Sequence, residues 1–316
     1  TIDNGSMIVQ PDVIDSLRQA KSPVVISHVV PDADALGSML AMSLALGAAN
    51  RQPKASLPPA SISQRLAFLL DWANVSAASK ADFASADAFI VLDTAKKDRC
   101  NVGPDLRQTE WSAGRPIINI DHHDSNTRFG TVNWIESSAA STCEMVYYLL
   151  HEAKLAISQT LASLLYAGIL TDTLGFSLPT TTPSSLRAAA GLAEFGADVG
   201  DLGERLGRSQ RKSEFDLLRV VYDNTRLVGD GTIAYSSASY DEIHDAGCTA
   251  ADIDEQINVP RSLNGVRLAM LFSEGRKDKT RINFRGSGNV TVIDLAAEFG
   301  GGGHSQAAGA ILDSSL

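Results

Sequence analysis

Cysteine is scarce in this sequence. Only three cysteines occur among the 316 residues, Cys100, Cys143 and Cys248, and they lie far apart. They show none of the paired spacings that hold zinc, and an odd number cannot all pair within one chain. We therefore expect reduced, buried thiols, as in a cytoplasmic protein rather than a disulfide-bonded secreted one.

Positive charge and long apolar runs are also in short supply. Lysine and arginine number 27 against 37 aspartates and glutamates, which gives a formal net charge of −10. Such a chain repels long polyanions, so we expect no binding to long duplex nucleic acid, and any nucleotide partner should be short. No run reaches membrane-spanning length, and the first residues lack the pattern of an export signal. These absences predict a cytoplasmic protein without membrane association.

Short apolar runs alternate with helical patterns in the first half of the chain. The runs are near-continuous, which is typical of parallel strands covered on both faces. They are PVVIS (23–27), AFIVL (88–92) and PIINI (116–120). The segment ALGSMLAMSLALGAAN predicts a helix that has Asp34 as its N-cap and ends at Asn50. This alternation is an α/β pattern.

The residue pattern changes after about residue 190, which indicates a second domain, as the length of 316 residues also suggests. A polar helical stretch gives way to strand-like segments such as RLVGDGTIAY, in which GDG is typical of a hairpin turn. We predict an α/β catalytic domain at 1–190, a helical linker at 191–225 and a smaller α+β domain at 226–316. The active site is expected in the cleft between the two domains.

Acidic and histidine side chains follow the ends of the predicted strands and of one later helix. They are His28, Asp32, Asp34, Asp93, Asp121, His122, His123 and Asp172. The carboxyl ends of parallel strands meet at one edge of a sheet, so these side chains should converge on one site. Their charges would repel one another without cations. Imidazole and carboxylate ligands without thiolate suit manganese, magnesium, zinc or iron, and their number suits two ions.

Each of these residues also has an ordinary structural explanation. An aspartate at a strand end most often caps a helix or forms a turn, and His28 alone is compatible with a core histidine. Those explanations would have to hold separately at every strand end, whereas one two-metal site explains the residues together.

The glycine run 300–303 is by itself more often a turn, but glycines also let backbone N–H groups approach phosphate.

Five ordered motifs resemble those of the DHH phosphoesterase superfamily. HVVPDADALGS, VLDT, IDHHDSN and LTDTLGF resemble its four motifs, and FGGGGHSQAAGA resembles the DHH-associated domain of the nanoRNase and phosphoadenosine phosphatase branch. The match covers nearly the whole chain. It implies a parallel-sheet DHH domain followed by a substrate-binding domain. Leu174 departs from the pattern, which more often has glycine after Asp-Thr, and alters the nearby substrate wall but not Asp172 as a ligand.

The resemblance also implies roles for individual residues. One metal ion would be held by His28, Asp32 and Asp93, and the other by Asp34, Asp93, His122 and Asp172, so that Asp93 bridges them. His123 would contact the scissile phosphate, and Asp121 would orient its neighbours. The substrate-holding residues of the second domain would be Arg285, Gly301, Gly302, Gly303 and His304.

These features predict a hydrolase in which two divalent ions, manganese or alternatively magnesium, activate water. Its substrates would be short oligonucleotides or a mononucleotide bisphosphate, 3′,5′-phosphoadenosine. A cyclic-dinucleotide phosphodiesterase and a non-catalytic nucleotide-sensing module are the alternatives. The C-terminal motif argues against an inorganic pyrophosphatase, and the lack of an evident long basic groove argues against a processive exonuclease. The sequence is compatible with a homodimer but does not determine the oligomeric state.

Overall fold

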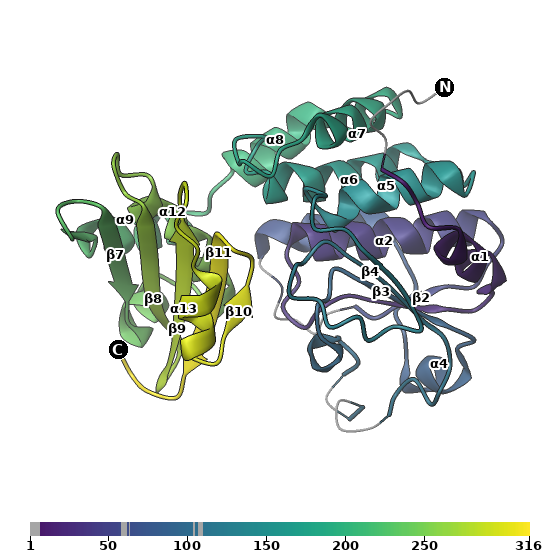
Figure 1. Cartoon of the computed structure of the whole chain (residues 1–316), viewed down its shortest axis with the longest axis horizontal. Helices are drawn as coiled ribbons and strands as arrows, with labels where there is room; N and C mark the ends of the chain where they lie inside the picture. The colour runs from purple at the N-terminus through teal and green to yellow at the C-terminus, as the bar shows by residue number, and fades with distance from the viewer. Residues whose placement is uncertain (1–6, 58–61, 63, 104, 107–109) are drawn as a thin grey trace. The chain divides into compact units, whose positions relative to one another are not determined.

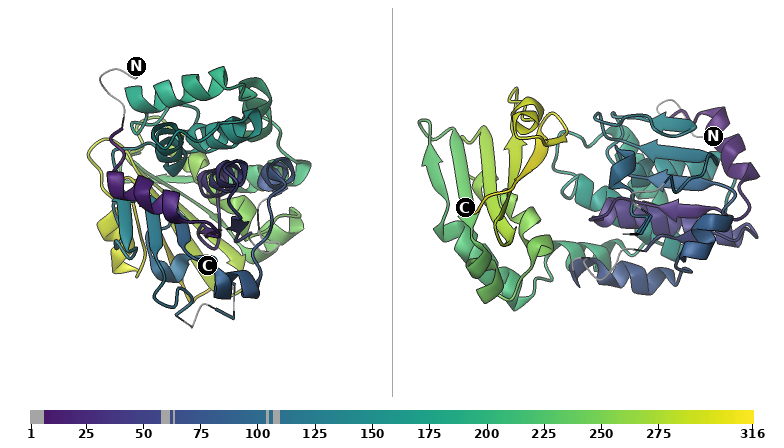
Figure 2. Two further views of the ribbon diagram at one scale, coloured as in Figure 1. Left: turned by 90° about the vertical axis from the view of Figure 1, so that its right-hand side faces the viewer. Right: turned by 90° about the horizontal axis from the view of Figure 1, so that it is seen from below.

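The chain forms two compact units, Thr1–Ser209 (unit 1) and Gln210–Leu316 (unit 2). The residues that the computed structural model describes are 7–57, 62, 64–103, 105–106 and 110–316. Each unit has its own sheet, as Figures 1 and 2 show. Within the described residues, no helix combines the length and the apolar character needed to cross a bilayer. The predicted α/β class is confirmed.

Unit 1 contains a five-stranded parallel sheet with the order β2-β1-β3-β4-β5. Its strands are β1 (Val24–Ile26), β2 (Lys54–Ala55), β3 (Phe89–Leu92), β4 (Ile117–Asp121) and β5 (Val132–Ile135). The three predicted strands form its centre as β1, β3 and β4. The apolar runs do not predict the two edge strands, because β2 has only two residues and β5 is only partly buried.

The central strands are apolar throughout because both of their faces are buried. Alternate side chains of a strand point to opposite faces of the sheet. Val25 and Ile90 pack with helices on one face, whereas Val24 and Phe89 pack on the other face near Trp111. Burial on two sides removes the polar alternation of a half-exposed strand and so explains the continuous runs.

The helices of unit 1 include three that pack against one another on one face of the sheet, α2, α5 and α6 (Figure 1). The α-helices are α1 (Pro11–Gln19), α2 (Ala33–Ala48), α3 (Ala67–Ala73), α4 (Lys80–Ser85), α5 (Thr142–Glu152), α6 (Gln159–Asp172), α7 (Pro183–Glu194) and α8 (Val199–Gly207). Two 3-10 turns are η1 (Gln64–Leu66) and η2 (Lys97–Arg99).

The start of α2 differs from the prediction. Asp32, not Asp34, is the N-cap, because its Oδ1 accepts hydrogen bonds from the backbone N–H groups of Asp34 and Ala35 at 3.1 and 3.0 Å. Asp34 therefore lies inside the first turn of the helix. Its carboxylate is free to point away from its own helix, towards α5.

Two glycines let α2 and α6 approach each other closely. A Cβ atom at Gly37 would lie 2.5 Å from the carbonyl oxygen of Leu164, and one at Gly168 would lie 2.8 Å from Oδ1 of Asp34. Both distances are shorter than real Cβ contacts allow, so a side chain at either position would force the helices apart. This packing fixes the place of Asp34.

Unit 2 contains a six-stranded mixed sheet with the order β10-β11-β9-β8-β7-β6, in which only the β7–β8 pair is parallel. Its strands are β6 (Arg226–Val228), β7 (Ile233–Ala238), β8 (Leu268–Arg276), β9 (Lys279–Gly286), β10 (Gly302–Gly303) and β11 (Ala307–Leu312). The predicted hairpin turn at Gly229–Gly231 joins β6 to its antiparallel neighbour β7.

Helices cover both faces of this second sheet. They are α9 (Lys212–Asp223), α10 (Tyr240–Asp245), α11 (Ala250–Ile253), the 3-10 turn η3 (Asp254–Ile257), α12 (Asn258–Arg261) and α13 (Ile293–Glu298). The longest, α9, contributes Leu217 to a buried cluster that also contains Ala238 of β7 and Leu271 of β8. On the opposite face, Ala296 of α13 packs with Phe284 of β9.

Candidate metal centre

The first group of candidate ligands lies where β1 and β3 end. His28 follows β1 by two residues, and Asp93 directly follows β3. Nε2 of His28 lies 3.5 Å from Oδ2 of Asp93. With Asp32 they form a set whose donor atoms all lie within 4.8 Å of one another. The structure thus brings together the three residues expected at one ion.

The second group lies at the ends of β4 and α6. Its members are Asp34, His122 and Asp172, whose donor atoms also lie within 4.8 Å of one another. Nε2 of His122 is 3.8 Å from Oδ2 of Asp34 and 3.3 Å from Oδ2 of Asp172. The same nitrogen is 3.5 Å from Oδ1 of Asp93. All members of the expected second set are therefore close together.

Asp93 lies between the two groups. Its Oδ2 faces His28, and its Oδ1 faces His122. The backbone of Asp93 is left-handed, with φ of +52°, and its N–H donates to the carbonyl of Ile120 at 3.0 Å. Aspartate is one of the few residues that adopt this conformation at low cost. This turn directs the carboxylate across the strand ends, so that each oxygen serves a different group.

The hydrogen bond of His122 sets which ring nitrogen is available. Its Nδ1 lies 3.4 Å from the carbonyl oxygen of Ala139, and because a carbonyl only accepts, Nδ1 carries the proton. Burial, followed by the charge of His123, lowers the pKa of His122, so the ring is neutral. Nε2 therefore presents a lone pair to three carboxylates. A cation placed between this lone pair and the carboxylates would interact favourably with all of them.

The pKa values of the carboxylates in and beside the second group reflect their crowding and burial. Burial raises the pKa of Asp34 well above its usual value, and the charges of Asp93 and Asp32 raise it further. Burial and the charge of Asp34 likewise raise the pKa of Asp172. Burial alone would also raise the pKa of Asp93, but a hydrogen bond from His28 and the charge of His123 lower it. The centre thus has more negative charge than its own groups neutralise.

Asp121 and His123 form a separate pair beside the two groups. Nδ1 of His123 donates to Oδ1 of Asp121 at 2.7 Å and lies 3.6 Å from Oδ1 of Asp93. Although burial lowers the pKa of His123, the hydrogen bond and charges of Asp121 and Asp93 raise it to about 10. The ring is therefore cationic at neutral pH. Asn126 holds the pair by donating to Oδ2 of Asp121 at 2.6 Å.

The donor set fits hard or borderline divalent cations. It consists of carboxylate oxygens and imidazole nitrogens, with no thiolate in either group. One side of the centre is open to solvent, since Asp32 is exposed and the side chains of Asp172 and His123 are 22% and 26% exposed. The arrangement can therefore hold cations and still admit a substrate.

Two contributors to the centre escape prediction from the sequence, Asn126 and the start of α5 at Thr142. Asn126 stands in the motif IDHHDSN, but amides at a turn give no clue to their partner. The start of α5 does have a signal, because Ser141 and Glu144 form the Ser-x-x-Glu pattern of a helix N-terminus. That pattern predicts the helix but not its contact with the carboxylates.

In unit 2, the predicted residue Arg285 lies among polar side chains. Arg281, Asn283 and Arg285 share one face of β9, because side chains alternate along a strand. Asp254 pairs with Arg281 at 3.0 Å and accepts a hydrogen bond from Asn283 at 3.2 Å. Burial, followed by the charge of Arg261, lowers the pKa of Arg285 to about 10. The arginines Arg261, Arg281 and Arg285 outnumber the carboxylate of Asp254 among these side chains. This group therefore carries excess positive charge and suits an anion.

The sheet surface beside Arg285 is built from very small residues. Ala307 of β11 is paired with Arg285, and Gly309 is paired with Asn283. Gly302 of β10 is in turn paired with Gly309, and a Cβ atom at Gly302 would meet no atom within 4 Å. A flat planar group or a phosphate can therefore approach this part of the backbone.

The other predicted glycines have a packing role. A Cβ atom at Gly301 would lie 2.1 Å from the carbonyl oxygen of Gly309, and one at Gly303 would lie 2.4 Å from that of Ala307. These two positions are thus needed for close pairing of β10 with β11. His304 follows in the hairpin turn, and its backbone N–H donates to Ala307 at 2.7 Å. Of the three predicted glycines, Gly302 is the one at which a Cβ atom would meet open space.

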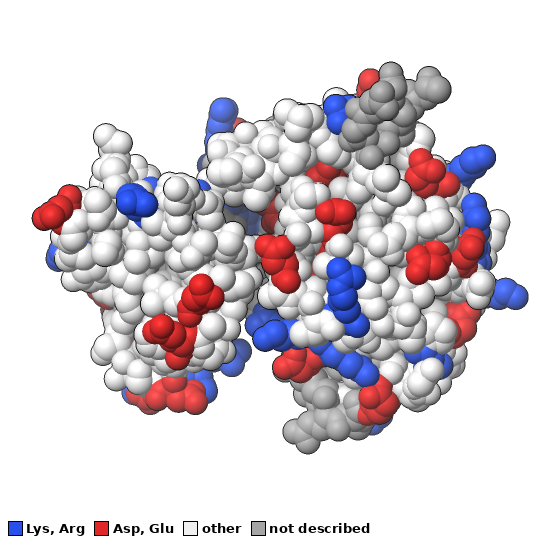
Figure 3. Space-filling view, in the orientation of Figure 1, with Lys and Arg blue, Asp and Glu red and all other residues white. Residues whose placement is uncertain are grey.

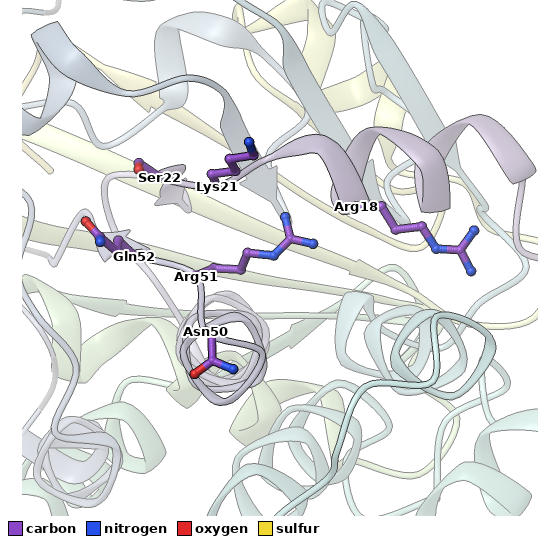
Figure 4. A pocket seen from close by; sticks show the side chains of 6 residues that line it. All are labelled: Arg18, Lys21, Ser22, Asn50, Arg51 and Gln52. Carbon is purple, nitrogen blue, oxygen red and sulfur yellow. The ribbon is translucent and has the colours of Figure 1, made fainter.

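A hollow lies at the opposite ends of the strands of the first sheet, away from the candidate metal centre. Ser22 and Gln52 come just before β1 and β2, so this hollow is at the amino ends of the strands (Figure 4). Its lining residues are Arg18, Lys21, Ser22, Asn50, Arg51 and Gln52. None of the candidate ligands belongs to it, and in parallel sheets ligand sites form at the carboxyl ends. It is therefore not the candidate centre.

Comparison with known proteins places the chain. The pattern of the DHH family, N-terminal domain, matches residues 23–169, and that of the DHHA1 domain matches residues 230–315. A relative from Thermus thermophilus, named bifunctional oligoribonuclease and PAP phosphatase NrnA, is 31% identical over 301 residues, or 95% of this chain and 87% of its own length. The chain belongs to the DHH family. The family membership expected from the five motifs is confirmed.

Solved structures agree with membership of the DHH family at the level of fold. An exopolyphosphatase-related protein from Bacteroides fragilis has a TM-score of 0.87 at 24% identity, covering 98% of this chain and 94% of its own. RecJ from Thermus thermophilus, solved in complex with Mn²⁺, has a TM-score of 0.55 at 14% identity. The match covers 98% of this chain and 53% of RecJ.

Leu174, which stands where the family pattern more often has glycine, adopts an unusual backbone conformation in this DHH-family chain. Leu174 follows α6 with φ of +48°, the left-handed region that favours the more usual glycine. Gly175 and Phe176 continue in the same region, at +65° and +62°. The Leu174 side chain is 45% exposed, two residues after Asp172. The departure thus adds an apolar side chain to the surface near the centre.

Proposed function

We propose that this DHH-family protein is a metal-dependent phosphoesterase that hydrolyses short oligoribonucleotides and 3′,5′-phosphoadenosine. The observation that carries the proposal is the position of Asp93 between two groups, with one oxygen facing each. His28, Asp32 and Asp93 would hold one divalent ion, and Asp34, Asp93, His122 and Asp172 the other. Manganese is our choice for both, with magnesium as the alternative.

Two ions at such a site, when bound, lower the pKa of water and neutralise charge on phosphate oxygens. The chain supplies what the reaction needs besides them. His122, neutral and proton-bearing at Nδ1, offers Nε2 as a ligand. His123, kept cationic by Asp121, would donate to the scissile phosphate, whose charge grows in the transition state. Asp121 would hold that ring in position and is itself held by Asn126.

Unit 2 would hold the part of the substrate away from the scissile phosphate. The positive charge of Arg285 is only partly balanced by nearby carboxylates. Arg285 would therefore bind a phosphate or stack on a base. The low surface around Gly302 would admit the flat face of a base, and Gly301, Gly303 and His304 would shape its border. We propose residues 1–190 as the catalytic domain, 191–225 as the linker and 226–316 as the substrate-binding domain.

A short substrate is favoured by charge as well as by the relatives' names. The net charge of −10 repels long polyanions. On the face drawn in Figure 3, the described acidic and basic side chains are interspersed, without a broad basic tract. Local cations at the metal centre would attract a few phosphates, whereas the surface would not retain a long strand.

The direct test is a hydrolysis panel with purified protein and manganese. The substrates are oligoribonucleotides of two to about ten nucleotides, a cyclic dinucleotide and 3′,5′-phosphoadenosine, each with and without a chelator. We expect metal-dependent release of mononucleotides from the shortest chains and of phosphate from phosphoadenosine. Tight binding of these ligands with no turnover would instead favour a nucleotide sensor.

Replacing Arg285 or His304 by alanine should impair hydrolysis of a dinucleotide much more than that of a small chromogenic phosphodiester. Binding energy from remote parts of a substrate aligns its reacting group, so its loss lowers both affinity and kcat. We expect kcat/KM for the dinucleotide to fall roughly ten- to a thousandfold, if each contact contributes about 1.5 to 4 kcal/mol. The chromogenic diester, too small to need unit 2, should react as before.

Arg226→Ala is the matched control for that comparison. Arg226 is an exposed arginine on edge strand β6 of the same sheet, and its side chain donates only to nearby backbone carbonyls among the contacts described. The control should leave both substrates unaffected. Equal losses for the two substrates in the Arg285 and His304 variants would show that these residues serve catalysis or folding, not substrate binding.

A further inference from the structure

The first turn of α5 contacts two of the metal-binding carboxylates. The first N–H groups of a helix have no partner within it. Here the N–H of Thr142 donates to Oδ2 of Asp34 and the N–H of Cys143 donates to Oδ1 of the same carboxylate, both at 2.7 Å. The N-cap Ser141 serves a different group, the N–H of Glu144. Asp34 therefore uses the two amides that the helix would otherwise leave unsatisfied.

Thr142 makes a second contact through its side chain. Its hydroxyl donates to Oδ1 of Asp93 at 3.1 Å. One residue thus bonds to Asp34 through its backbone and to Asp93 through its side chain, although these aspartates follow different strands. Oδ1 of Asp93 is also the oxygen that faces His122. The hydroxyl consequently fixes the rotation of the carboxylate that serves both groups.

The surroundings leave no substitute for these bonds. Thr142 and Asp34 are fully buried, and Asp93 is 2% exposed, so water cannot readily replace a lost donor. The carboxylate of Asp34 also cannot move towards α6, because Gly168 lies so close to its Oδ1 that not even a methyl group would fit between them. Two buried carboxylates repel each other, and neutral donors such as a hydroxyl and amides reduce that repulsion without competing for a cation.

We propose that Thr142 is a positioning residue for the metal centre, which fixes the bridging carboxylate of Asp93 relative to Asp34. The inference rests on the proposed function, since it assigns the carboxylates to bound ions. Groups that hold a ligand side chain through hydrogen bonds commonly change metal affinity ten- to a hundredfold when they are removed. The role needs the hydroxyl of Thr142 and not its methyl group.

The test is calorimetric titration of manganese into the metal-free full chain, without substrate. Thr142→Val keeps the shape but lacks the hydroxyl, whereas Thr142→Ser keeps the hydroxyl but lacks the methyl group. We expect the valine variant to bind manganese about ten- to a hundredfold more weakly and the serine variant to bind within about threefold of the parent. Ser43→Ala removes another buried hydroxyl, one that bonds to Met39 on α2, and should leave the affinity unchanged.

Thermal unfolding of each variant in chelator separates loss of fold from loss of metal. If the valine variant does not fold, Thr142→Ala provides the same comparison, since it also lacks the hydroxyl and cannot overfill the site. Parent-like affinity in folded valine or alanine variants overturns the proposal. So does an equal loss in the serine variant, because the methyl group would then matter. If the parent chain itself binds no manganese, the proposed metal chemistry fails first, and this inference falls with it.

Discussion

Replacing Asp93 by asparagine should abolish phosphoester hydrolysis while leaving the fold intact. Each oxygen of Asp93 faces a different group of ligands, so the amide nitrogen of asparagine would disturb one group and the lost charge would weaken both. We expect the rate to fall by about a thousandfold or more, which corresponds to roughly 4 kcal/mol of transition-state stabilisation. Asparagine tolerates the φ of +52° at this position, so the backbone has no reason to change.

Three measurements on this variant distinguish the explanations. Metal analysis should show less manganese per chain, circular dichroism should be unchanged, and hydrolysis should not recover at high manganese. Asp121→Asn is a useful comparison, because Asp121 bonds to His123 and Asn126 and lies outside both ligand sets proposed for the ions. Near-parental activity of Asp93→Asn with manganese would rule out the two-ion assignment.

The adjacent histidines should respond differently to replacement by alanine. His122→Ala removes a neutral ring whose Nε2 lies within 3.8 Å of three carboxylates, and should lower metal occupancy. His123→Ala removes a cationic ring held by Asp121, and should retain the metal but lose rate. We expect the rate of the second variant to fall about a hundred- to a thousandfold, as when one transition-state donor is removed.

Metal content and kcat measured on the same preparations test this division. The His123 variant should have unchanged metal content at saturating manganese, whereas the His122 variant should regain part of its activity as manganese is raised. Equal loss of metal from both proteins would mean that the two rings share one task. Unchanged turnover in the His123 variant would remove the cationic ring from the reaction.

The sequence predicts the sheet and the metal centre for the same reason. Burial on both faces gives β1, β3 and β4 their apolar runs, and a polar residue that ends such a run, like Asp93, is conspicuous. Parallel topology then places all such residues at one edge, so distances in sequence do not matter. The structure accordingly brings together the residues selected from the motifs in unit 1.

What the sequence does not predict is how the centre is held. Thr142 lies 49 residues from Asp93 and 108 from Asp34, and a threonine at the start of a helix has ordinary uses. The sequence predicts the N-cap of α2 two residues too late, because both Asp32 and Asp34 have capping side chains and only the fold shows which one turns towards α5. Such choices depend on contacts between elements, which no local pattern records.

The candidate ligands also constrain the order in which unit 1 can assemble. They come from the ends of β1, β3, β4 and α6 and from the start of α2, with the first at His28 and the last at Asp172. A short loop joins β1 to α2, but the other segments lie far apart in sequence, so the full set of ligands meets only after contacts between distant parts of the chain have formed. A metal ion held by this set would favour the folded unit, because the unfolded chain does not bring the ligands together. Bound ions would therefore slow the unfolding of unit 1 rather than speed its folding.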